Sequence, residues 1–253
     1  MPRYSLILAS FFAFWNFACQ NPSGSTNVPD KNLDGKSLFT AVHGTAALDG
    51  SGSDTVWEKT NWLPLDQVWF GPAPPKTDAS GRYKLAWDEN FLYILAEIED
   101  DKPWEAHNQG NEGYWNDDCL LVLIDEDASG GDHEFNHNAF AYHIALDDQV
   151  VDIAPDSSFR LFNDHCFVRR IPKGNSNTWE IGVRIFDGNH FNPEEENVPK
   201  LLTAGKKIGF ALAYKDNDGS LECENIIGNI PMPTTNDKRS WTNASTFGIL
   251  TLQ

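Results

Sequence analysis

Short stretches in which apolar and polar residues alternate recur along most of this 253-residue chain. Alternation with a period of two places every second side chain on one face of a β-strand. Gly, Pro, Asn and Asp separate the stretches, as they do in turns. The pattern predicts strands over residues 82–87, 91–98, 119–124, 139–146, 150–153, 166–171, 179–186, 207–214 and 246–252.

Helical patterns are short by comparison. No run longer than about ten residues keeps a period of 3.6 with capping residues at its ends. Residues 57–62 (WEKTNW) are long enough for one helical turn. Many strands, few helices and turn-rich connections predict an all-β fold, an antiparallel β-sandwich of the jelly-roll or immunoglobulin-like two-sheet type.

The clearest pair of strands flanks the turn Asp88-Glu89-Asn90 within RYKLAWDENFLYILAEIEDDKPW, residues 82–104. Its alternating apolar residues, with Trp87 among them, are expected in the core, as is Trp179 in a later strand. The acidic run Glu99-Asp100-Asp101 is expected to end the second strand through charge and turn chemistry. Trp104 then follows in polar sequence.

The N-terminus has the features of an export signal. Arg3 precedes an apolar run over residues 6–17, and a small residue precedes Cys19. This order is typical of a secretory signal peptide, and the run is too short to span a bilayer as a stable helix. A cysteine at this place resembles the lipidated residue of bacterial lipoproteins. The alternative is soluble export or simple tethering.

These features predict a division of the chain into a signal peptide, residues 1–18, and a tether, residues 19–37. The tether is rich in Ser, Asn, Pro, Gly and Asp, which cannot build a core, so we expect it to be flexible. Residues 38–253 contain no repeat and no linker and are expected to form one domain. We expect the protein in the cell envelope, lipid-anchored through Cys19 to the outer membrane or cell surface.

The charge of the chain narrows the classes of partner. It has 37 acidic and 19 basic residues, a formal net charge of −18. Such a chain cannot replace the counterions on a phosphate backbone, nor dock on anionic lipid through a basic patch. We therefore expect no nucleic-acid partner, and membrane contact only through the lipidated N-terminus. An acidic surface suits neutral ligands, Ca²⁺ or solubility alone.

Two acidic loops place oxygen-bearing side chains at alternate positions before a glycine. One contains Asp125, Asp127 and Ser129, and the other contains Asp216 and Asp218. This alternation is how calcium loops begin, so structural calcium is expected to hold either loop in place. The alternative is a pair of Asx turns between strands, because Asp, Asn and Gly also favour such turns.

Compact catalytic motifs are absent from the sequence, which lacks G-x-S-x-G, H-E-x-x-H and a Gly-rich phosphate loop. No catalytic residue is therefore named, although the acidic residues are numerous enough to supply a glycosidase carboxylate pair. His133, His137 and His143 follow an acidic loop and are expected to lie at the surface or to be hydrogen-bonded rather than to bind a transition metal. Cys119 and Cys166 are expected in the core.

Three tryptophans, Trp104, Trp115 and Trp241, stand in polar loop sequences. An indole in such a place either folds back over the core or is presented to a ligand. Pyranose rings have an apolar face that stacks on indole and a rim of hydroxyls that Asp, Asn and Gln bind. Three such tryptophans beside amides and carboxylates favour a sugar-binding platform.

The chain resembles the family 9 carbohydrate-binding modules. The resemblance lies in LDGSGSDTVW (48–57), AWDENFLYILAEIEDDKPW (86–104), YWNDDCLLVLIDED (114–127), WEIGVRIF (179–186), KIGFALAYKDNDG (207–219) and SWTNASTFGILTL (240–252), in that order. It covers nearly all of residues 40–253. It implies a β-sandwich that binds polysaccharide or oligosaccharide, typically chain ends, without catalysis and with structural calcium. Modules of this family are often appended to xylan-degrading enzymes.

The resemblance also implies site residues. Two tryptophans sandwich the sugar in this family, and by position they resemble Trp104, with Trp115 as the competing candidate, and Trp241. Polar residues beside the next strand bind hydroxyls, which resembles Asn116 and Asp117. Two other functions stay open: a hydrolytic enzyme acting on polysaccharide, and a surface partner-binding module that has lost sugar recognition.

Overall fold

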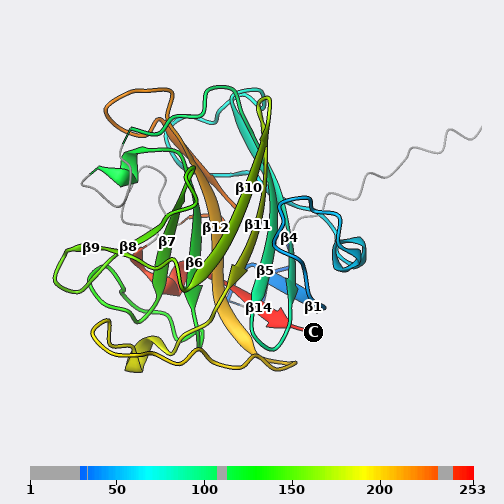
Figure 1. The fold of residues 1–253 in the computed structure, drawn as a ribbon, viewed down its shortest axis with the longest axis vertical. Helices are drawn as coiled ribbons and strands as arrows, with labels where there is room; N and C mark the ends of the chain where they lie inside the picture. Colours follow the sequence, from blue (N-terminus) through cyan, green and yellow to red (C-terminus); the bar gives the residue numbers. More distant parts are fainter. Residues whose placement is uncertain (1–28, 33, 107–112, 233–241) are drawn as a thin grey trace, which may run out of the picture.

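The computed structural model describes residues 29–32, 34–106, 113–232 and 242–253. The predicted signal peptide, Cys19 and Trp241 lie outside these ranges. Fourteen strands and a few single-turn 3₁₀ helices make up the described part (Figure 1). None of the helices in it is long and apolar enough to cross a membrane.

The first sheet has the strand order β10-β11-β5-β4-β1, and β2 also pairs with β4. Its strands are β10 (Cys166–Lys173), β11 (Ser176–Val183), β5 (Leu92–Asp100), β4 (Ala79–Trp87), β1 (Leu38–His43) and β2 (Leu63–Leu65). The β4–β5 hairpin pairs Trp87 with Leu92 beside its turn and Ala79 with Asp100 at its far end. The hairpin turn therefore lies at one end of the sandwich, and Asp100 lies at the other.

The second sheet continues from β1 in the order β14-β12-β6-β7-β8-β9, with β13 between β12 and β3. Its strands are β14 (Gly248–Leu252), β12 (Lys207–Asp216), β6 (Cys119–Asp125), β7 (Phe140–Ala145), β8 (Val150–Ile153), β9 (Phe159–Leu161), β13 (Asn225–Gly228) and β3 (Gln67–Phe70).

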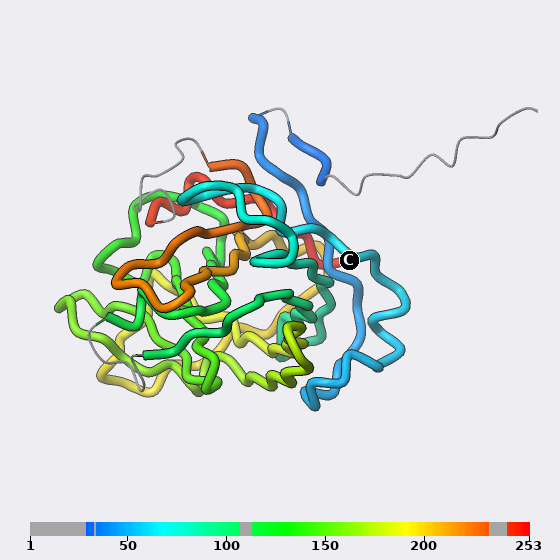
Figure 2. The backbone as a smooth tube through the Cα atoms, turned by 90° about the horizontal axis from the view of Figure 1, so that it is seen from above, coloured from blue at the N-terminus to red at the C-terminus, as the bar shows by residue number. Residues whose placement is uncertain are grey.

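The strand β1 belongs to both sheets and joins them. Residues 38–41 pair in parallel with β14, and Val42 and His43 pair in parallel with β4. Figure 2 shows the C-terminal end of the chain next to this N-terminal strand. All other pairings between the named strands are antiparallel.

The core lies between and around the two sheets. Trp87 and Trp179 are 3% and 0% exposed, which confirms their predicted place. Every residue of β6 is buried, as expected of a central strand that is covered on both faces. Cys119 and Cys166 are buried as predicted, and they and Cys223 are free thiols.

The predicted strands are all present, with ends that shift by a few residues, and residues 55–59 form a 3₁₀ turn, η1 (Thr55–Lys59). The alternation did not predict β1, β2, β3, β9 and β13. These strands are short, and β2 contains Pro64, so their pairing depends on neighbours distant in sequence.

The histidine prediction was wrong in part. His133, His137 and His143 are all buried. His143 is hydrogen-bonded, but neither ring nitrogen of His137 has a partner among the described residues. Aromatic rings surround His137: Phe140 is stacked on it at 5.3 Å between centroids, and Phe191 meets it edge-on at 4.8 Å. Burial among rings lowers the pKa of His137 to about 4, so it is neutral at pH 7.

The tight packing around Gly228 leads to a testable prediction. The indole of Trp69 is fully buried, donates a 2.7 Å hydrogen bond to the Ile230 carbonyl, and covers Gly228 so closely that an added Cβ would lie 2.1 Å from a ring carbon. Gly228→Ala is therefore expected to lower the free energy of unfolding by about 1–3 kcal/mol, since overpacking forces the ring or the strand to move.

Urea unfolding of the wild type and two variants checks this prediction. Gly182→Ala is the control, because its new methyl group would meet the movable end of Leu48 at 2.9 Å and the ring of Phe91 only at 3.3 Å. Gly228→Ala should be clearly less stable than Gly182→Ala. Equal stabilities would contradict the packing described here.

Candidate functional site

A cavity of about 380 Å³ lies beside the 3₁₀ turn η2 (Tyr114–Asn116). It lies near the end of the sandwich where β5 and β12 terminate, which is at the top of Figure 1. Its walls come from η2, from Ile153 in β8, from Lys215 in β12 and from the segment of residues 221–226. The cavity thus joins segments that are more than a hundred residues apart in sequence.

The half-buried indole of Trp115 forms one wall of this cavity. Tyr114 meets it edge-on with the ring centroids 5.4 Å apart, and Phe159 lies 5.3 Å away on β9. These two contacts hold the indole in position, and its remaining surface lines the cavity. A fixed aromatic surface of this kind suits stacking on the apolar face of a ligand ring.

A buried polar pair lies behind the indole. Lys215 is 3% exposed, and its Nζ donates to the Trp115 carbonyl oxygen at 2.9 Å and lies 3.2 Å from His143 Nε2. Burial, and the Lys215 charge next, keep the pKa of His143 well below its usual value. The imidazole is therefore neutral, which lets Nε2 accept from Lys215 while Nδ1 donates to the Ala141 carbonyl at 3.0 Å.

Asn116 lines the same cavity, whereas Asp117 does not. The Asn116 backbone carbonyl accepts a 2.7 Å hydrogen bond from Asn217, but its side-chain amide makes none to another residue in the described ranges. Asp117 is 2% exposed and accepts a 3.1 Å hydrogen bond from the Ala106 backbone. Asn116 can thus bind a ligand, while Asp117 fixes the loop.

Trp104 lies outside the cavity lining. Its backbone and Asp118 exchange two hydrogen bonds, Trp104 N to Asp118 Oδ2 at 2.6 Å and Asp118 N to the Trp104 carbonyl at 3.1 Å. Its ring lies against Gly219, where an added Cβ would be 3.2 Å from ring carbons. Of the two competing tryptophans, the structure brings Trp115 together with Asn116. Trp241, the third candidate, lies outside the described residues.

Several residues of the cavity were missed from the sequence. They are Tyr114, His143, Ile153, Lys215, Leu221, Glu222, Cys223 and Ile226. Lys215 carried one usable signal, because a lysine follows the apolar run ALAY inside a strand. Leu221 is 94% exposed at the rim of the cavity, and nothing in the local pattern distinguishes it from other loop residues.

Three buried carboxylates meet next to this site. Asp100, Asp118 and Asp216 each offer an oxygen within 4.8 Å of the others, and all three are at most 2% exposed. The strand β5 ends at Asp100 as predicted, and Asp100 accepts a 2.9 Å hydrogen bond from the Lys102 backbone in the turn, but its carboxylate also accepts a hydrogen bond from Tyr214 in the interior, which the sequence did not indicate. Burial, and then the charge of Asp100, raises the pKa of Asp118 to about 9 and of Asp216 to about 7.

A second carboxylate group, more exposed, lies close by. It consists of Asp78, Asp101 and Asp218, again with oxygens within 4.8 Å of one another. Oδ1 of Asp218 is buried and has no hydrogen-bond partner among the described residues. The predicted ligands Asp216 and Asp218 thus belong to two neighbouring groups rather than to one loop site.

The other predicted calcium loop forms a turn. Asp127 accepts a 2.9 Å hydrogen bond from the Ser129 backbone, and Asp125 accepts one of 2.7 Å from Gly130. Oδ1 of Asp125 is buried without a partner in the described part of the chain, and burial raises the pKa of Asp125 to about 6. The two carboxylates lie together, but no third His, Cys, Asp or Glu of the described residues joins them.

Comparison with known proteins gives the family. Residues 48–253 match the family described as Carbohydrate family 9 binding domain-like. The chain is 26% identical to Endo-1,4-beta-xylanase A of Thermotoga maritima over 91% of this chain and 19% of that protein. It is 25% identical to Exoglucanase XynX of Acetivibrio thermocellus over 85% of this chain and 17% of that protein. The chain thus spans about a fifth of the length of these relatives.

Solved structures share the fold. A carbohydrate binding module family 9 from Caldicellulosiruptor kristjanssonii in complex with cellotriose superposes with a TM-score of 0.64 and 18% identity, over 85% of this chain and 93% of that one. A putative carbohydrate-binding protein from Bacteroides uniformis superposes with a TM-score of 0.58 and 10% identity, over 86% and 100%. These likenesses confirm the predicted β-sandwich.

Proposed function

Since the chain belongs to the carbohydrate family 9 binding domain-like family, we propose that it binds oligosaccharides or the ends of polysaccharides without catalysis. The sugar stacks on Trp115, and Asn116 binds its hydroxyls. The single observation that carries this proposal is the fixed, half-buried indole of Trp115 in a cavity that also contains polar groups.

Size and chemistry support the proposal. The cavity volume, about 380 Å³, lies in the range usual for small-ligand sites, about 300–1,000 Å³. Apolar surface from Trp115 and Leu221 stands beside the Asn116 amide and the Glu222 carboxylate, a combination that suits a sugar ring and its hydroxyls. Relatives with this fold have been solved with cellotriose and with glucose.

Hydrolysis at this cavity has less support. Glycoside hydrolysis of the usual kind needs two carboxyl groups on either side of the scissile bond. Among the described residues that line the cavity, Glu222 alone carries a carboxylate. Asp117 and Asp118 are close in sequence, but both are buried and used in hydrogen bonds to the backbone.

Calorimetric titration of the purified protein with cellotriose and with glucose tests the function. Saturable binding of either sugar, without new reducing ends after incubation with polysaccharide, is the expected result. New reducing ends would favour the enzyme. A folded protein that binds none of the sugars on a glycan array would favour the partner-binding module.

We also propose that calcium binds at the carboxylate group of Asp100, Asp118 and Asp216. Around one Ca²⁺, oxygen ligands lie about 2.3–2.6 Å from the ion, so oxygens within 4.8 Å of one another fit a shared ion. No salt bridge in the described part of the chain reaches these buried carboxylates. Buried like charges need a cation or protons. Asp78, Asp101 and Asp218 would hold a second ion, with the unpartnered Oδ1 of Asp218 as a ligand.

We further propose that the protein is exported and lipid-anchored through Cys19. The support is the order of charge, apolar run and small residue before this cysteine. In a bacterial host fed a clickable fatty acid, the wild-type protein should be labelled and Cys19→Ala should not. Labelling of both forms alike would exclude Cys19 as the anchor.

A further inference from the structure

A second and larger cavity, of about 630 Å³, lies at the other end of the sandwich. The segment of residues 186–201 (yellow at the bottom of Figure 1) covers one side of it, and the β4–β5 turn and the ends of β9 and β11 provide the rest. Asn90 and Phe91 at that turn precede β5, whose other end carries Asp100 near the first site. No residue lines both cavities.

Arg184 is the cation that distinguishes this cavity. Its guanidinium lies 4.8 Å from the ring centre of Phe167 and 5.7 Å from that of Phe91, and Nη1 donates a 3.3 Å hydrogen bond to the Asp164 carbonyl. Within the described ranges it makes no ion pair with a carboxylate. A guanidinium has five N–H donors in a fork that matches a carboxylate, so most of its donors are unused.

The other two cations that line the cavity are already neutralised. Arg160 pairs with Glu194 at 2.7 Å and with Asp156 at 3.5 Å, and Lys200 pairs with Asp187 at 2.8 Å. Within the described ranges Arg169 and Arg170 also make no ion pair with a carboxylate, but neither of them lines this cavity. Arg184 therefore stands out as a site for an anion that comes from outside the chain.

Burial separates the charges within the cavity. Arg184 is half-buried in the wall, whereas the lining carboxylates Asp164, Glu195 and Glu196 are exposed. Exposed carboxylates are screened by water and can turn away, so they oppose an anion in the interior only weakly. The same groups can accept hydrogen bonds from hydroxyls at the rim.

Aromatic and amide groups complete the site. Phe91, Phe186 and Phe191 give it apolar surface, and Asn90 and Asn197 lie in its lining. A wall of this composition suits a ring with one apolar face and several hydroxyls more than it suits a bare carboxylate. The volume also exceeds what a small anion needs.

We propose that this cavity binds an acidic sugar, a uronic acid residue, whose carboxylate pairs with the Arg184 guanidinium while its ring lies against the phenylalanines. The molecule would then have two independent saccharide sites, at opposite ends of the sandwich. The proposal does not depend on sugar binding at Trp115, because the two sites share no residue.

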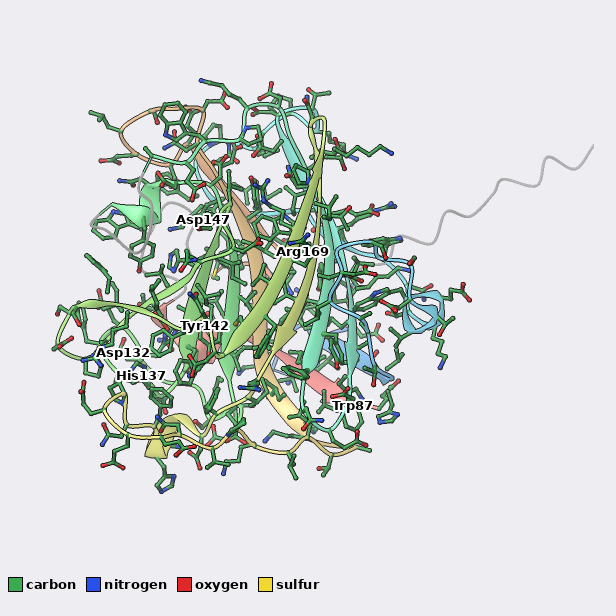
Figure 3. All side chains as sticks on the ribbon, viewed as in Figure 1. Trp87, Asp132, His137, Tyr142, Asp147 and Arg169 are labelled. Atoms are coloured by element: carbon green, nitrogen blue, oxygen red, sulfur yellow. The ribbon has the colours of Figure 1, made fainter. Side chains whose placement is uncertain are left out.

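The test is titration of the full chain with sodium D-glucuronate, D-glucose and sodium acetate, in the wild type and in four variants. Glucuronate should bind the wild type and Trp115→Ala equally. Arg184→Gln should weaken it about tenfold to a hundredfold, the usual cost of removing a charged hydrogen-bond partner, and Arg184→Lys should weaken it less. Arg169→Gln is the matched control, since Arg169 is exposed on β10 (Figure 3) and outside the cavity lining.

Several results would overturn the proposal. These are no binding of glucuronate, equal binding of acetate by the wild type, equal binding of glucose by Trp115→Ala, and equal affinity for glucuronate in Arg184→Gln and the wild type. If Arg184→Gln does not fold, the Nε–H resonance of Arg184 in the wild type decides, because glucuronate must shift it and acetate at the same concentration must not. Loss of glucuronate binding in Trp115→Ala would assign it to the first site instead.

Discussion

Replacing Trp115 by alanine is expected to weaken cellotriose binding by about 2 kcal/mol or more, roughly thirtyfold in affinity. Such a loss is usual where a buried aromatic residue anchors a ligand, because the variant loses both the apolar contact and the shape of the wall. Tyr114 and Phe159 hold the indole before the ligand arrives, at 5.4 and 5.3 Å between ring centroids. The wild type thus loses little side-chain entropy on binding. Calorimetry measures the difference directly.

Trp104→Ala is the matched control for this experiment. Trp104 was the leading candidate from the sequence, and it stands in an equally polar loop. Since its ring packs on Gly219 outside the cavity lining, the affinity should change less than about threefold. Circular dichroism shows whether each variant is folded. A large loss of cellotriose affinity in Trp104→Ala, with none in Trp115→Ala, would show that the sugar stacks on Trp104 instead.

The choice between these two tryptophans could not be made from sequence, for a physical reason. Both indoles follow acidic residues and precede polar ones, so composition treats them alike. What separates them is the pair of hydrogen bonds between Trp104 and Asp118, which folds the loop back. This contact spans fourteen residues and depends on where β6 begins. Local pattern contains no information about it.

The strands were easier to predict than the acidic residues. In the β4–β5 hairpin the alternation itself fixes which side chains face the core. From the sequence, Asp100 was expected to end its strand through charge and turn chemistry, and nothing in the local pattern indicated burial. It is buried because β12 brings Tyr214 and Asp216 to it from over a hundred residues away. A buried carboxylate is unfavourable unless another group compensates its charge. The residue type alone therefore favours a surface position for Asp100, whereas the fold places it in the interior.

Hydrogen bonds connect the carboxylate group of Asp100, Asp118 and Asp216 to the cavity beside Trp115. Asn217, directly after Asp216, donates its backbone N–H to Asp118 at 2.7 Å and its side-chain amide to the Asn116 carbonyl at 2.7 Å. The loop that carries part of the carboxylate group therefore also holds η2, where Trp115 lies. An ion that orders these carboxylates would also order the cavity wall that Trp115 forms.

Chelation of divalent cations is therefore expected to destabilise the protein strongly. With calcium at a thousandfold excess over its dissociation constant, a site present only in the folded state contributes about 4 kcal/mol. In a domain of this size that corresponds to a fall in melting temperature of roughly 10 °C. Differential scanning calorimetry with calcium and with chelator measures it. An unchanged melting temperature would refute a structural ion.

The effect of chelation should increase with pH, and its sign follows from the carboxyl groups. Without a cation, burial raises the pKa of Asp118 to about 9 and of Asp216 to about 7, above the ordinary value of 3.8. The unfolded chain releases these protons near pH 4, and the folded protein only at higher pH. The free energy of unfolding of the metal-free protein should therefore fall as pH rises from about 4 to about 9. Calcium takes the place of these protons, so it stabilises little at pH 5 and most at pH 8.

The variant Asp216→Asn distinguishes a calcium site from a group of buried carboxylates that binds no ion. Asp216 already accepts a 2.9 Å hydrogen bond from Asn225, which an asparagine oxygen can also accept, while the new amide can donate to the other carboxylates. In chelator at pH 8 this variant should be more stable than the wild type, because one buried charge is gone, and calcium should no longer raise its melting temperature. Glu99→Gln, an exposed change next to Asp100 on β5, should behave like the wild type in both conditions. If calcium stabilised Asp216→Asn as much as the wild type, the ion would have to bind elsewhere.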